Sequence, residues 1–406
     1  MSDKFNSYRY KTQPYEHQKK VLKDSWAELY YAYLLEMGTG KSKCAIDNIG
    51  MLYEDNKINA VLIIAPKGVM DNWSKGEIPV HLPDRIPRIV CGWTPSSSKK
   101  FAEELKHITY HKTNDLKFFV MNVEAFSTSK GTKAAYEFLL KNPENMVVVD
   151  ESTTIKNRKA ARTKNIMELR NVSLYRRILT GSPVTKSPMD LFSQCFFLSP
   201  RALGFNSYYA FQNRYAQVQS RTMGNRSFQE IVGYRRLDEL NEKLLSFSNR
   251  TLKEDCLDLP EKIYTRRHIE LTDEQLTVYT QMKKLALAQL QNGDLATTES
   301  VLTQIMRLQQ ICCGFFQPDE GAIQPLANNR LSGLMSVIDE CSGKAIIWAS
   351  YTYDIQRIAQ ALRDRFGPDS VATYFGGTPQ NDRQDIVNKF QDAYSDLRFF
   401  VGQPKT

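Results

Sequence analysis

Short apolar runs alternate with longer, helix-like segments in the first 180 residues of the chain. The apolar runs are β-rich and strand-length: YYAYLL, AVLIIAP, FFVMN, MVVVD and RRILTG. Segments with helical patterns separate them, beginning with residues 41–53. Strands that are apolar on both faces and are separated by helices are typical of a parallel, doubly wound sheet. The pattern therefore predicts an α/β domain.

The pattern becomes largely helical between about residues 190 and 340. Two segments there are candidates for amphipathic helices, LDELNEKLLSFSNRTL and LTDEQLTVYTQMKKLALAQLQNG. We interpret this region as an insertion followed by a linker. A second alternation of strands and helices begins at KAIIWAS and reaches LRFFVGQ. It predicts only three parallel strands, fewer than a sheet usually has, so we expect the second α/β domain to be incomplete.

Length and composition fit a globular protein with more than one domain. The 406 residues suit two or three domains, and 42% hydrophobic with 24% charged residues is an ordinary soluble composition. The apolar runs are far shorter than the roughly 18–20 residues of a membrane-spanning helix. The polar start MSDKFNSYRYK lacks the apolar core of a signal peptide. We therefore expect an intracellular protein without a membrane span.

Cysteine and charge patterns narrow the expected partners. The seven cysteines include no Cys-x-x-Cys pair, and there are only five histidines, so we expect no zinc site and interpret the cysteines as reduced, packed thiols. The formal charge of +9 favours polyanionic partners through phosphate contacts. Many basic proteins bind no polyanion, so charge alone assigns no partner.

The stretch LLEMGTGKSK ends like a phosphate-binding loop, between a predicted strand and a predicted helix. Its two glycines allow the tight turn whose N–H groups face phosphate oxygens. Lys41 supplies a positive charge for the β and γ phosphates, and Ser42 can offer its hydroxyl to Mg²⁺. Leu35 stands where the standard pattern has its first glycine, so a chance match is the alternative. The residues predicted to bind nucleotide here are Met37, Gly38, Thr39, Gly40, Lys41 and Ser42.

The second chemical motif is VVVDEST, in which an apolar strand ends at Asp150 and Glu151. In phosphoryl transfer, Asp150 would hold the Mg²⁺ shell and Glu151 would orient or deprotonate the attacking water. The alternative is structural, because an Asp-Glu pair after a strand can simply cap the next helix. The phosphate loop upstream favours the catalytic interpretation, with Lys41, Asp150 and Glu151 as the catalytic residues.

A third strand, in ILTGSPV, also ends in small polar residues. In a motor, Thr180 and Ser182 would sense the γ-phosphate near Glu151 and pass the nucleotide state to the nucleic-acid side. The alternative is a plain strand-to-turn junction before Pro183.

These blocks, in this order, resemble the motifs of superfamily 2 helicases, and most of all those of the SNF2 (Swi2/Snf2) family of double-stranded DNA translocases. The carriers are EMGTGKS, IIAPKGVMDNWSKG, DESTTIKNRKAART and LTGSPVTKSPMDLFSQCFFLSP, with YEHQKKVL before them and VEAFSTSKG between. KAIIWASYTYDIQRIAQAL and FGGTPQNDRQDIVNKFQ are similar to blocks of the family's second lobe. Ser152 and Thr153 replace the family's Ala-His, and Ser182 replaces a Thr. The lost His is expected to affect how hydrolysis is coupled to motion.

The resemblance implies two RecA-like lobes, each a parallel doubly wound sheet, with helical insertions. We expect an ATP-binding lobe, a helical protrusion and linker, a helical part of the second lobe and a partial C-terminal lobe, at residues 1–195, 196–265, 266–335 and 336–406. The second lobe is expected to be truncated, because the chain ends before the family's glycine-rich fifth motif and arginine-bearing sixth motif. An arginine finger is worth on the order of 10³–10⁵ in rate. We therefore expect slow turnover even with DNA, unless Arg383 or Arg398 replaces the finger.

The resemblance also implies that Gln18 contacts adenine. An amide suits this task, because it can pair with both a ring nitrogen and the exocyclic amine of adenine. The alternative is a solvent-facing helix residue. Trp73 and Trp348 are expected to lie in cores rather than to stack on bases.

The stretch KNRKAARTK, which follows the Asp-Glu motif, contains five basic residues and no acid. It lies where a nucleic-acid backbone would pass, so we predict that Lys156, Arg158 and Lys159 contact phosphates, and that Lys67 does the same. The alternative is a solvated charged face.

We therefore predict an ATP-dependent motor of SNF2 type that acts on double-stranded DNA and remodels DNA or protein–DNA complexes, with ATP and Mg²⁺ as cofactors. A protein partner or a further C-terminal portion would complete it. The chain resembles compact bacterial or phage-encoded members of the family, which work in the cytoplasm. Two alternatives stay open: a non-cycling module that binds ATP and DNA, and an RNA helicase, which would carry Asp-Glu-Ala-Asp and Ser-Ala-Thr blocks that are absent here.

Overall fold

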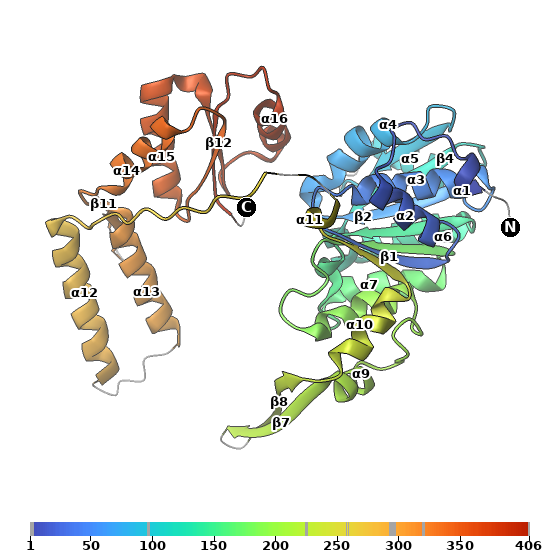
Figure 1. Ribbon diagram of the computed structural model, residues 1–406, viewed down its shortest axis with the longest axis horizontal. Helices are drawn as coiled ribbons and strands as arrows, with labels where there is room; N and C mark the ends of the chain where they lie inside the picture. Colours follow the sequence, from blue (N-terminus) through green and yellow to red (C-terminus); the bar gives the residue numbers. More distant parts are fainter. Residues whose placement is uncertain are drawn as a thin grey trace. The chain divides into compact units, whose positions relative to one another are not determined.

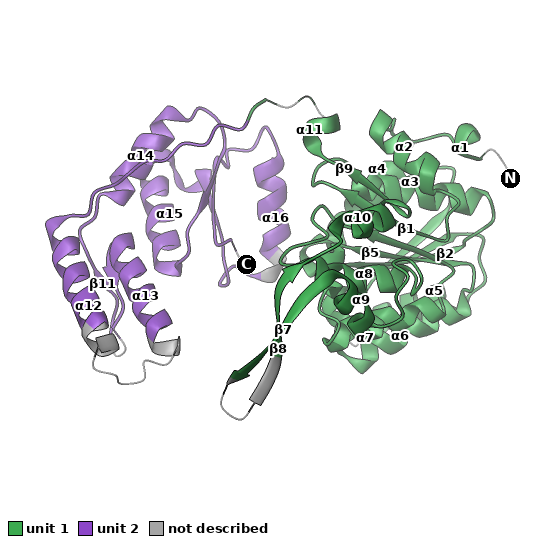
Figure 2. Cartoon of the chain, turned by 60° about the horizontal axis from the view of Figure 1, so that its bottom comes forward, with its two compact units in different colours: residues 1–261 green, residues 262–406 purple. Residues whose placement is uncertain are grey.

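The computed structural model describes residues 4–404, except 96–97, 224–225, 257, 259, 292–297 and 319–320. The chain divides into two compact units, residues 1–261 and 262–406 (Figures 1 and 2). The helices of the first unit are α1 (Lys4–Ser7), α2 (Glu16–Ser25), α3 (Lys41–Glu54), α4 (Ile78–His81), α5 (Lys99–Tyr110), α6 (Ser129–Lys141), α7 (Ala161–Glu168), α8 (Leu191–Leu198), α9 (Tyr208–Tyr215), α10 (Leu237–Leu245) and α11 (Lys253–Cys256).

A seven-stranded sheet forms the centre of the first unit, and all neighbouring strands in it are parallel. The strands, in their order across the sheet, are β3 (Arg88–Gly92), β4 (Leu116–Asn122), β2 (Ala60–Ala65), β5 (Asn145–Asp150), β6 (Tyr175–Leu179), β1 (Tyr30–Leu35) and β9 (Ser248–Thr251). The apolar runs of the sequence thus occupy the middle of the sheet.

The sheet is buried on both faces, because alternate residues of its strands point into two separate cores. In β2, Leu62 and Ile64 belong to one core, Val61 and Ile63 belong to the other, and all four side chains are fully buried. Helices α5 to α8 contribute to the first core and α2 to α4 contribute to the second. The predicted α/β fold with a parallel, doubly wound sheet is therefore confirmed.

An antiparallel hairpin projects from the first unit where the pattern predicted mostly helix (Figure 2). It consists of β7 (Ala216–Met223) and β8 (Arg226–Tyr234), and it lies between the short helices α9 and α10. The β-branched residues of this segment favour an extended backbone over a helix, and they include Val218, Thr222, Ile231 and Val232.

The second unit has a smaller parallel sheet in the order β12 (Ala345–Trp348), β14 (Phe399–Gly402) and β13 (Val371–Tyr374). Its core contains apolar side chains of the sheet and of the helices beside it, including Ile355, Leu362 and Phe399. The remaining elements are α12 (Asp273–Gln291), α13 (Thr298–Cys313), β10 (Phe315–Phe316), β11 (Gln324–Pro325), α14 (Arg330–Glu340), α15 (Thr352–Phe366) and α16 (Gln380–Gln391). None of the helices in the described parts of the chain is both long and apolar enough to cross a bilayer.

Two tryptophans that were expected in cores differ in burial. Trp73 is 1% exposed and belongs to the core on the α3 side of the large sheet, as predicted. The prediction is wrong for Trp348, which is 56% exposed. Trp348 lies on β12, an edge strand whose alternate residues Ile346 and Trp348 are both exposed.

Candidate active site

A tight loop with two left-handed glycines joins β1 to α3. The φ angles of Gly38 and Gly40 are +83° and +87°, a backbone region that side chains with a Cβ rarely adopt. A Cβ atom on Gly40 would also lie only 2.2 Å from Nε2 of Gln18. The loop leads into the N-terminus of a helix of 14 residues, where backbone N–H groups are available for an anion. The geometry is that of a phosphate-binding loop.

The side chains of the loop divide into an inner and an outer set. Thr39 is buried, and its hydroxyl donates to the Glu36 carbonyl at 2.7 Å. Met37 is 67% exposed, while Lys41 and Ser42 are half-buried at the start of α3. Lys41 and Ser42 are therefore at the helix end that an anion would approach.

Gln18 of α2 is fixed against this loop. It is 2% exposed, its Nε2 group donates to the Thr39 carbonyl at 3.1 Å, and its Oε1 accepts from the Tyr15 N–H at 3.0 Å. The alternative of a solvent-facing helix residue is therefore wrong. The contact with adenine stays a prediction. His17, which the sequence did not single out, also reaches the Thr39 carbonyl through Nε2 at 2.9 Å.

The three predicted motifs meet at one edge of the sheet. Strands β5, β6 and β1 are direct neighbours, and the register pairs Asp150 with Leu179 and Leu179 with Tyr33. Because parallel strands end at the same edge, the Asp150–Glu151 pair, the Thr180–Ser182 turn and the phosphate loop follow each other along it in this order. This edge is the usual place for a ligand in an open α/β sheet.

Asp150 is buried at the end of β5, and both of its carboxylate oxygens accept hydrogen bonds. Oδ2 accepts from the indole N–H of Trp73 at 2.8 Å, and Oδ1 accepts from the Glu151 N–H at 2.9 Å. Burial raises the pKa of Asp150, while these two hydrogen bonds and the charge of Lys41 act in the opposite direction.

Glu151 has a left-handed backbone, with φ 45° and ψ 59°. Such a conformation costs a residue with a side chain about 1–3 kcal/mol and is concentrated at functional sites. Its Oε2 accepts a long hydrogen bond of 3.4 Å from the hydroxyl of buried Thr180, whose Oγ1 in turn accepts from the Ser182 N–H at 3.2 Å. Burial raises the pKa of Glu151, and the charge of Lys41 opposes this rise. A carboxylate with a raised pKa is suited to accept a proton from water.

A second connection between the Asp-Glu motif and the Thr180 turn was missed by sequence reasoning. The hydroxyl of Ser152, fully buried, donates to Oε1 of Gln194 at 2.7 Å. The Nε2 group of Gln194 donates to the carbonyls of Pro183 and Asp190, each at 2.8 Å. Ser152, which stands in place of the family's Ala, therefore links the catalytic pair to the turn after β6.

Lys253 at the start of α11 is another neighbour of the phosphate loop that the sequence did not indicate. Its Cε and Nζ lie 3.4 and 3.7 Å from the position that a Cβ on Gly38 would take. The pairing of β9 with β1 brings it there, and its own N–H donates to Oε2 of Glu36 at 2.9 Å. A second ammonium group thus lies beside the loop.

The donor set at this edge fits a magnesium ion that is held jointly with a nucleotide. Asp150 supplies a carboxylate and Ser42 a hydroxyl, which are hard oxygen ligands. In the part of the chain that the structure describes, no group of three or more His, Cys, Asp or Glu side chains is arranged to hold a metal ion. The ion would therefore share its shell with phosphate oxygens and water.

The predicted basic residues lie on the surface near the same edge. Lys67 is exposed directly after β2, in the short 3₁₀ turn Lys67–Val69. Arg158 packs its guanidinium 4.0 Å from the ring of Tyr208, and Lys156 bonds to the Thr185 hydroxyl. Within the described ranges of the chain, none of the four predicted phosphate-contacting side chains forms an ion pair with an Asp or Glu. These side chains are Lys67, Lys156, Arg158 and Lys159.

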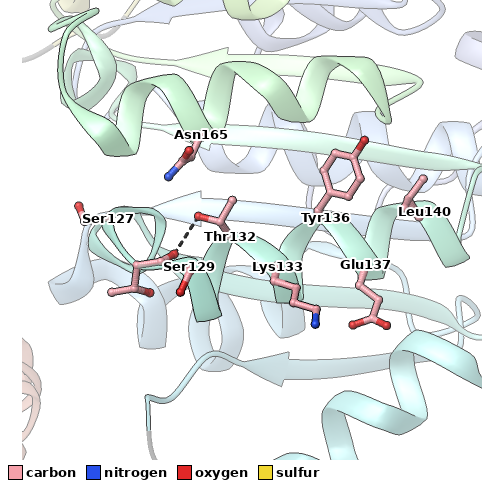
Figure 3. A pocket seen from close by; sticks show the side chains of 9 residues that line it. Ser127, Ser129, Thr132, Lys133, Tyr136, Glu137, Leu140 and Asn165 are labelled. Carbon is pink, nitrogen blue, oxygen red and sulfur yellow. Dashed lines mark hydrogen bonds between the residues drawn. The ribbon is translucent and has the colours of Figure 1, made fainter.

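Two surface pockets lie on the first unit. One, of about 440 Å³, is lined by Lys156 to Lys159, by the neighbouring tyrosines of α9 and by Gln229 of the hairpin. The other, of about 630 Å³, lies along α6 and includes residues of the VEAFSTSKG block (Figure 3). In it, the Thr132 hydroxyl donates to the Thr128 carbonyl at 2.9 Å, and Asn165 of α7 closes one side.

Comparisons with known proteins agree with this geometry. A family model described as the SNF2-related domain matches residues 34–316. The chain is 24% identical over 395 residues to the SWI/SNF chromatin-remodeling complex subunit snf22 of Schizosaccharomyces pombe, over 90% of this chain and 22% of that protein. It is 25% identical over 372 residues to the DNA annealing helicase and endonuclease ZRANB3 of Bos taurus, over 88% of this chain and 30% of that protein. The chain thus spans less than a third of the length of each of these relatives.

Among solved structures, the Sulfolobus solfataricus SWI2/SNF2 ATPase core in complex with dsDNA is similar, with a TM-score of 0.48 and 21% identity over 98% of this chain and 79% of that chain. The family match covers most of the chain and includes the phosphate loop, the Asp150–Glu151 pair and the Thr180 turn. The chain therefore belongs to the SNF2-related family of helicase-like ATPases.

Proposed function

We propose that this chain is the core of an ATP-hydrolysing motor that moves along double-stranded DNA and remodels DNA or protein–DNA complexes. The observation that carries the proposal is the meeting of three motifs at one sheet edge, with Glu151 held in a strained backbone conformation between Lys41 and Thr180. Backbone strain of this kind is concentrated at functional sites, and here it falls on a carboxylate beside a phosphate loop.

The phosphate loop binds and orients the nucleotide. The N–H groups of the loop and the first turn of α3 face phosphate oxygens, and Lys41 neutralises part of their charge. Gln18 is tied to the loop through Thr39, and its role in recognising the base is proposed from its resemblance to the family's first motif. Magnesium, when bound, would neutralise further phosphate charge, with Ser42 and Asp150 as its protein ligands.

Glu151 acts on the attacking water. Its burial and raised pKa favour acceptance of a proton from that water, and Thr180 holds one of its oxygens. Because Thr180 also accepts from the Ser182 N–H, a change at Glu151 reaches the turn after β6. The bond from Ser152 to Gln194 gives a second route to the same turn.

The basic surface after the Asp-Glu motif binds the DNA backbone. Lys156, Arg158 and Lys159 have no carboxylate partner among the described residues, so their charges are available for phosphates. Backbone contacts suit a motor, because equivalent contacts recur at every step whatever the sequence. The similarity to a chromatin-remodeling complex subunit and to a DNA annealing helicase supports a DNA substrate.

The test compares ATP turnover and nucleotide affinity with no nucleic acid, with duplex DNA and with single-stranded RNA. We expect duplex DNA to give the largest increase in turnover and Lys41→Ala to lose nucleotide binding. Stimulation by RNA alone would replace this proposal by an RNA helicase. Tight binding of ATP and DNA without any turnover would replace it by a non-cycling module. Comparing the parent with Lys41→Ala keeps the test valid even where absolute rates are low.

A further inference from the structure

Trp73 is buried against the catalytic edge and bonded to the carboxylate there. Its side chain is 1% exposed, and its indole N–H donates to Oδ2 of Asp150 at 2.8 Å. A buried indole N–H needs a hydrogen-bond partner, but backbone carbonyls or hydroxyls can serve. Here the partner is the one carboxylate that the proposed function assigns to the metal.

The backbone that carries Trp73 is itself unusual. Residues Asn72–Glu77 form a single π-helical turn, and the Ile78 N–H donates to the Trp73 carbonyl. Such turns are rare and occur frequently at functional sites. The Trp73 ring belongs to the same core as Val148 of β5, the strand that ends at Asp150. Both the backbone and the packing therefore fix where the indole N–H points.

This arrangement determines the orientation of the carboxylate. An ionised carboxylate has about four acceptor positions. Trp73 occupies one on Oδ2, and the Glu151 N–H occupies one on Oδ1 at 2.9 Å. The two donors hold the carboxylate plane from opposite oxygens, and they leave the remaining lone pairs for a metal ion or its water.

We propose that Trp73 is a positioning residue, whose indole N–H holds the Asp150 carboxylate in the orientation in which it binds magnesium at the nucleotide site. The inference rests on the proposed function of Asp150 as a metal ligand. Groups that orient a metal ligand through a hydrogen bond typically change metal affinity about 10- to 100-fold when they are removed. The effect should therefore appear in metal binding itself, before any turnover.

The experiment measures Mn²⁺ binding to the ADP complex of the protein by electron paramagnetic resonance, and ADP binding in EDTA by calorimetry. Trp73→Phe should weaken Mn²⁺ binding by about 10-fold or more and leave ADP affinity in EDTA unchanged. The matched control is Trp93→Phe. Trp93 is also buried, at 8% exposure, but it packs against Phe101 and Phe119 in the opposite core. This control should bind Mn²⁺ like the parent.

A second version removes the N–H group alone. Incorporation at position 73 of a tryptophan analogue with sulfur in place of the indole N–H keeps the ring size, so it tests the hydrogen bond even if Trp73→Phe fails to fold. Parent-like Mn²⁺ affinity with this analogue, together with a large loss in Asp150→Asn, would overturn the positioning role and leave the magnesium site intact. If Asp150→Asn also bound Mn²⁺ like the parent, the proposed magnesium site itself would be wrong.

Discussion

Gly40→Ala should damage nucleotide binding more than any other single glycine-to-alanine change in or near the phosphate loop. Alanine at φ +87° costs about 1–2 kcal/mol, because the left-handed region brings its Cβ too close to the backbone. The same Cβ would lie 2.2 Å from Nε2 of Gln18, a contact that real Cβ atoms do not make. Gln18 must then move and lose its hydrogen bond to Thr39, at a further cost of about 1 kcal/mol.

The free variant escapes this total of about 2–3 kcal/mol by relaxing its loop, and ADP binding must restore the strained loop, so ADP affinity should be weaker by on the order of 100-fold. Two control variants separate the contributions. Gly38→Ala has similar backbone strain, but its Cβ would meet only Lys253 at an ordinary 3.4 Å, so we expect about 5- to 30-fold weaker binding. Gly68→Ala has nothing within 4 Å of the new Cβ and should bind like the parent.

Calorimetric titration of ADP into the four proteins gives these ratios, and thermal unfolding shows whether each variant remains folded. Equal losses in Gly40→Ala and Gly38→Ala would mean that the contact with Gln18 has no energetic weight. Parent-like binding by Gly40→Ala would refute the loop geometry described above.

Three further predictions concern stability, coupling and DNA. Burial raises the pKa of Asp47 to about 6 from an ordinary 3.8, so its contribution to stability is complete below pH 3.8 and is lost as the pH rises through 6. In Asp47→Asn, the free energy of unfolding measured in urea should therefore depend less on pH between those values. An unchanged slope of this free energy against pH would contradict the prediction. Ser152→Ala removes the hydrogen bond to Gln194. It should therefore lower the rate of ATP turnover with duplex DNA more than the rate without DNA. Equal losses in both rates would argue that this bond does not couple DNA binding to ATP turnover. The affinity for duplex DNA should fall steeply with salt and vary little with DNA sequence. In fluorescence anisotropy titrations, Lys159→Ala should lower the slope of log K against log salt by about 1. A preference for one DNA site that persists at high salt would exclude backbone binding.

Much of the site could be predicted from the sequence, because its parts are short motifs at the ends of apolar strands. Once the parallel sheet is inferred from the apolar runs, the phosphate loop, Asp150–Glu151 and Thr180 must end at one edge. That β5, β6 and β1 are direct neighbours is a finding of the structure, because the apolar runs alone do not determine the order of strands. The two glycines of the loop can be identified from the sequence because the tight turn needs a positive φ, which glycine adopts most easily.

The contacts that the sequence did not indicate all join residues far apart in the chain. Trp73 meets Asp150, Ser152 meets Gln194, and Lys253 lies beside Gly38, and in each case the fold determines which side chains meet. Trp73 was correctly expected in the core, but burial alone does not reveal which acceptor its N–H will find. The hairpin β7–β8 was missed because a weak apolar pattern inside a helical region does not distinguish a strand from a helix.

The proposed function depends most on Glu151, which we propose activates water for hydrolysis of ATP held by the phosphate loop. The most direct measurement is single-turnover phosphate release from pre-bound ATP in the presence of duplex DNA, for the parent and for Glu151→Gln. We expect Glu151→Gln to bind ATP with the affinity of the parent and to release no phosphate above background, because the amide keeps the shape of the side chain and cannot take the proton. Release of phosphate by Glu151→Gln at the rate of the parent would contradict the claim.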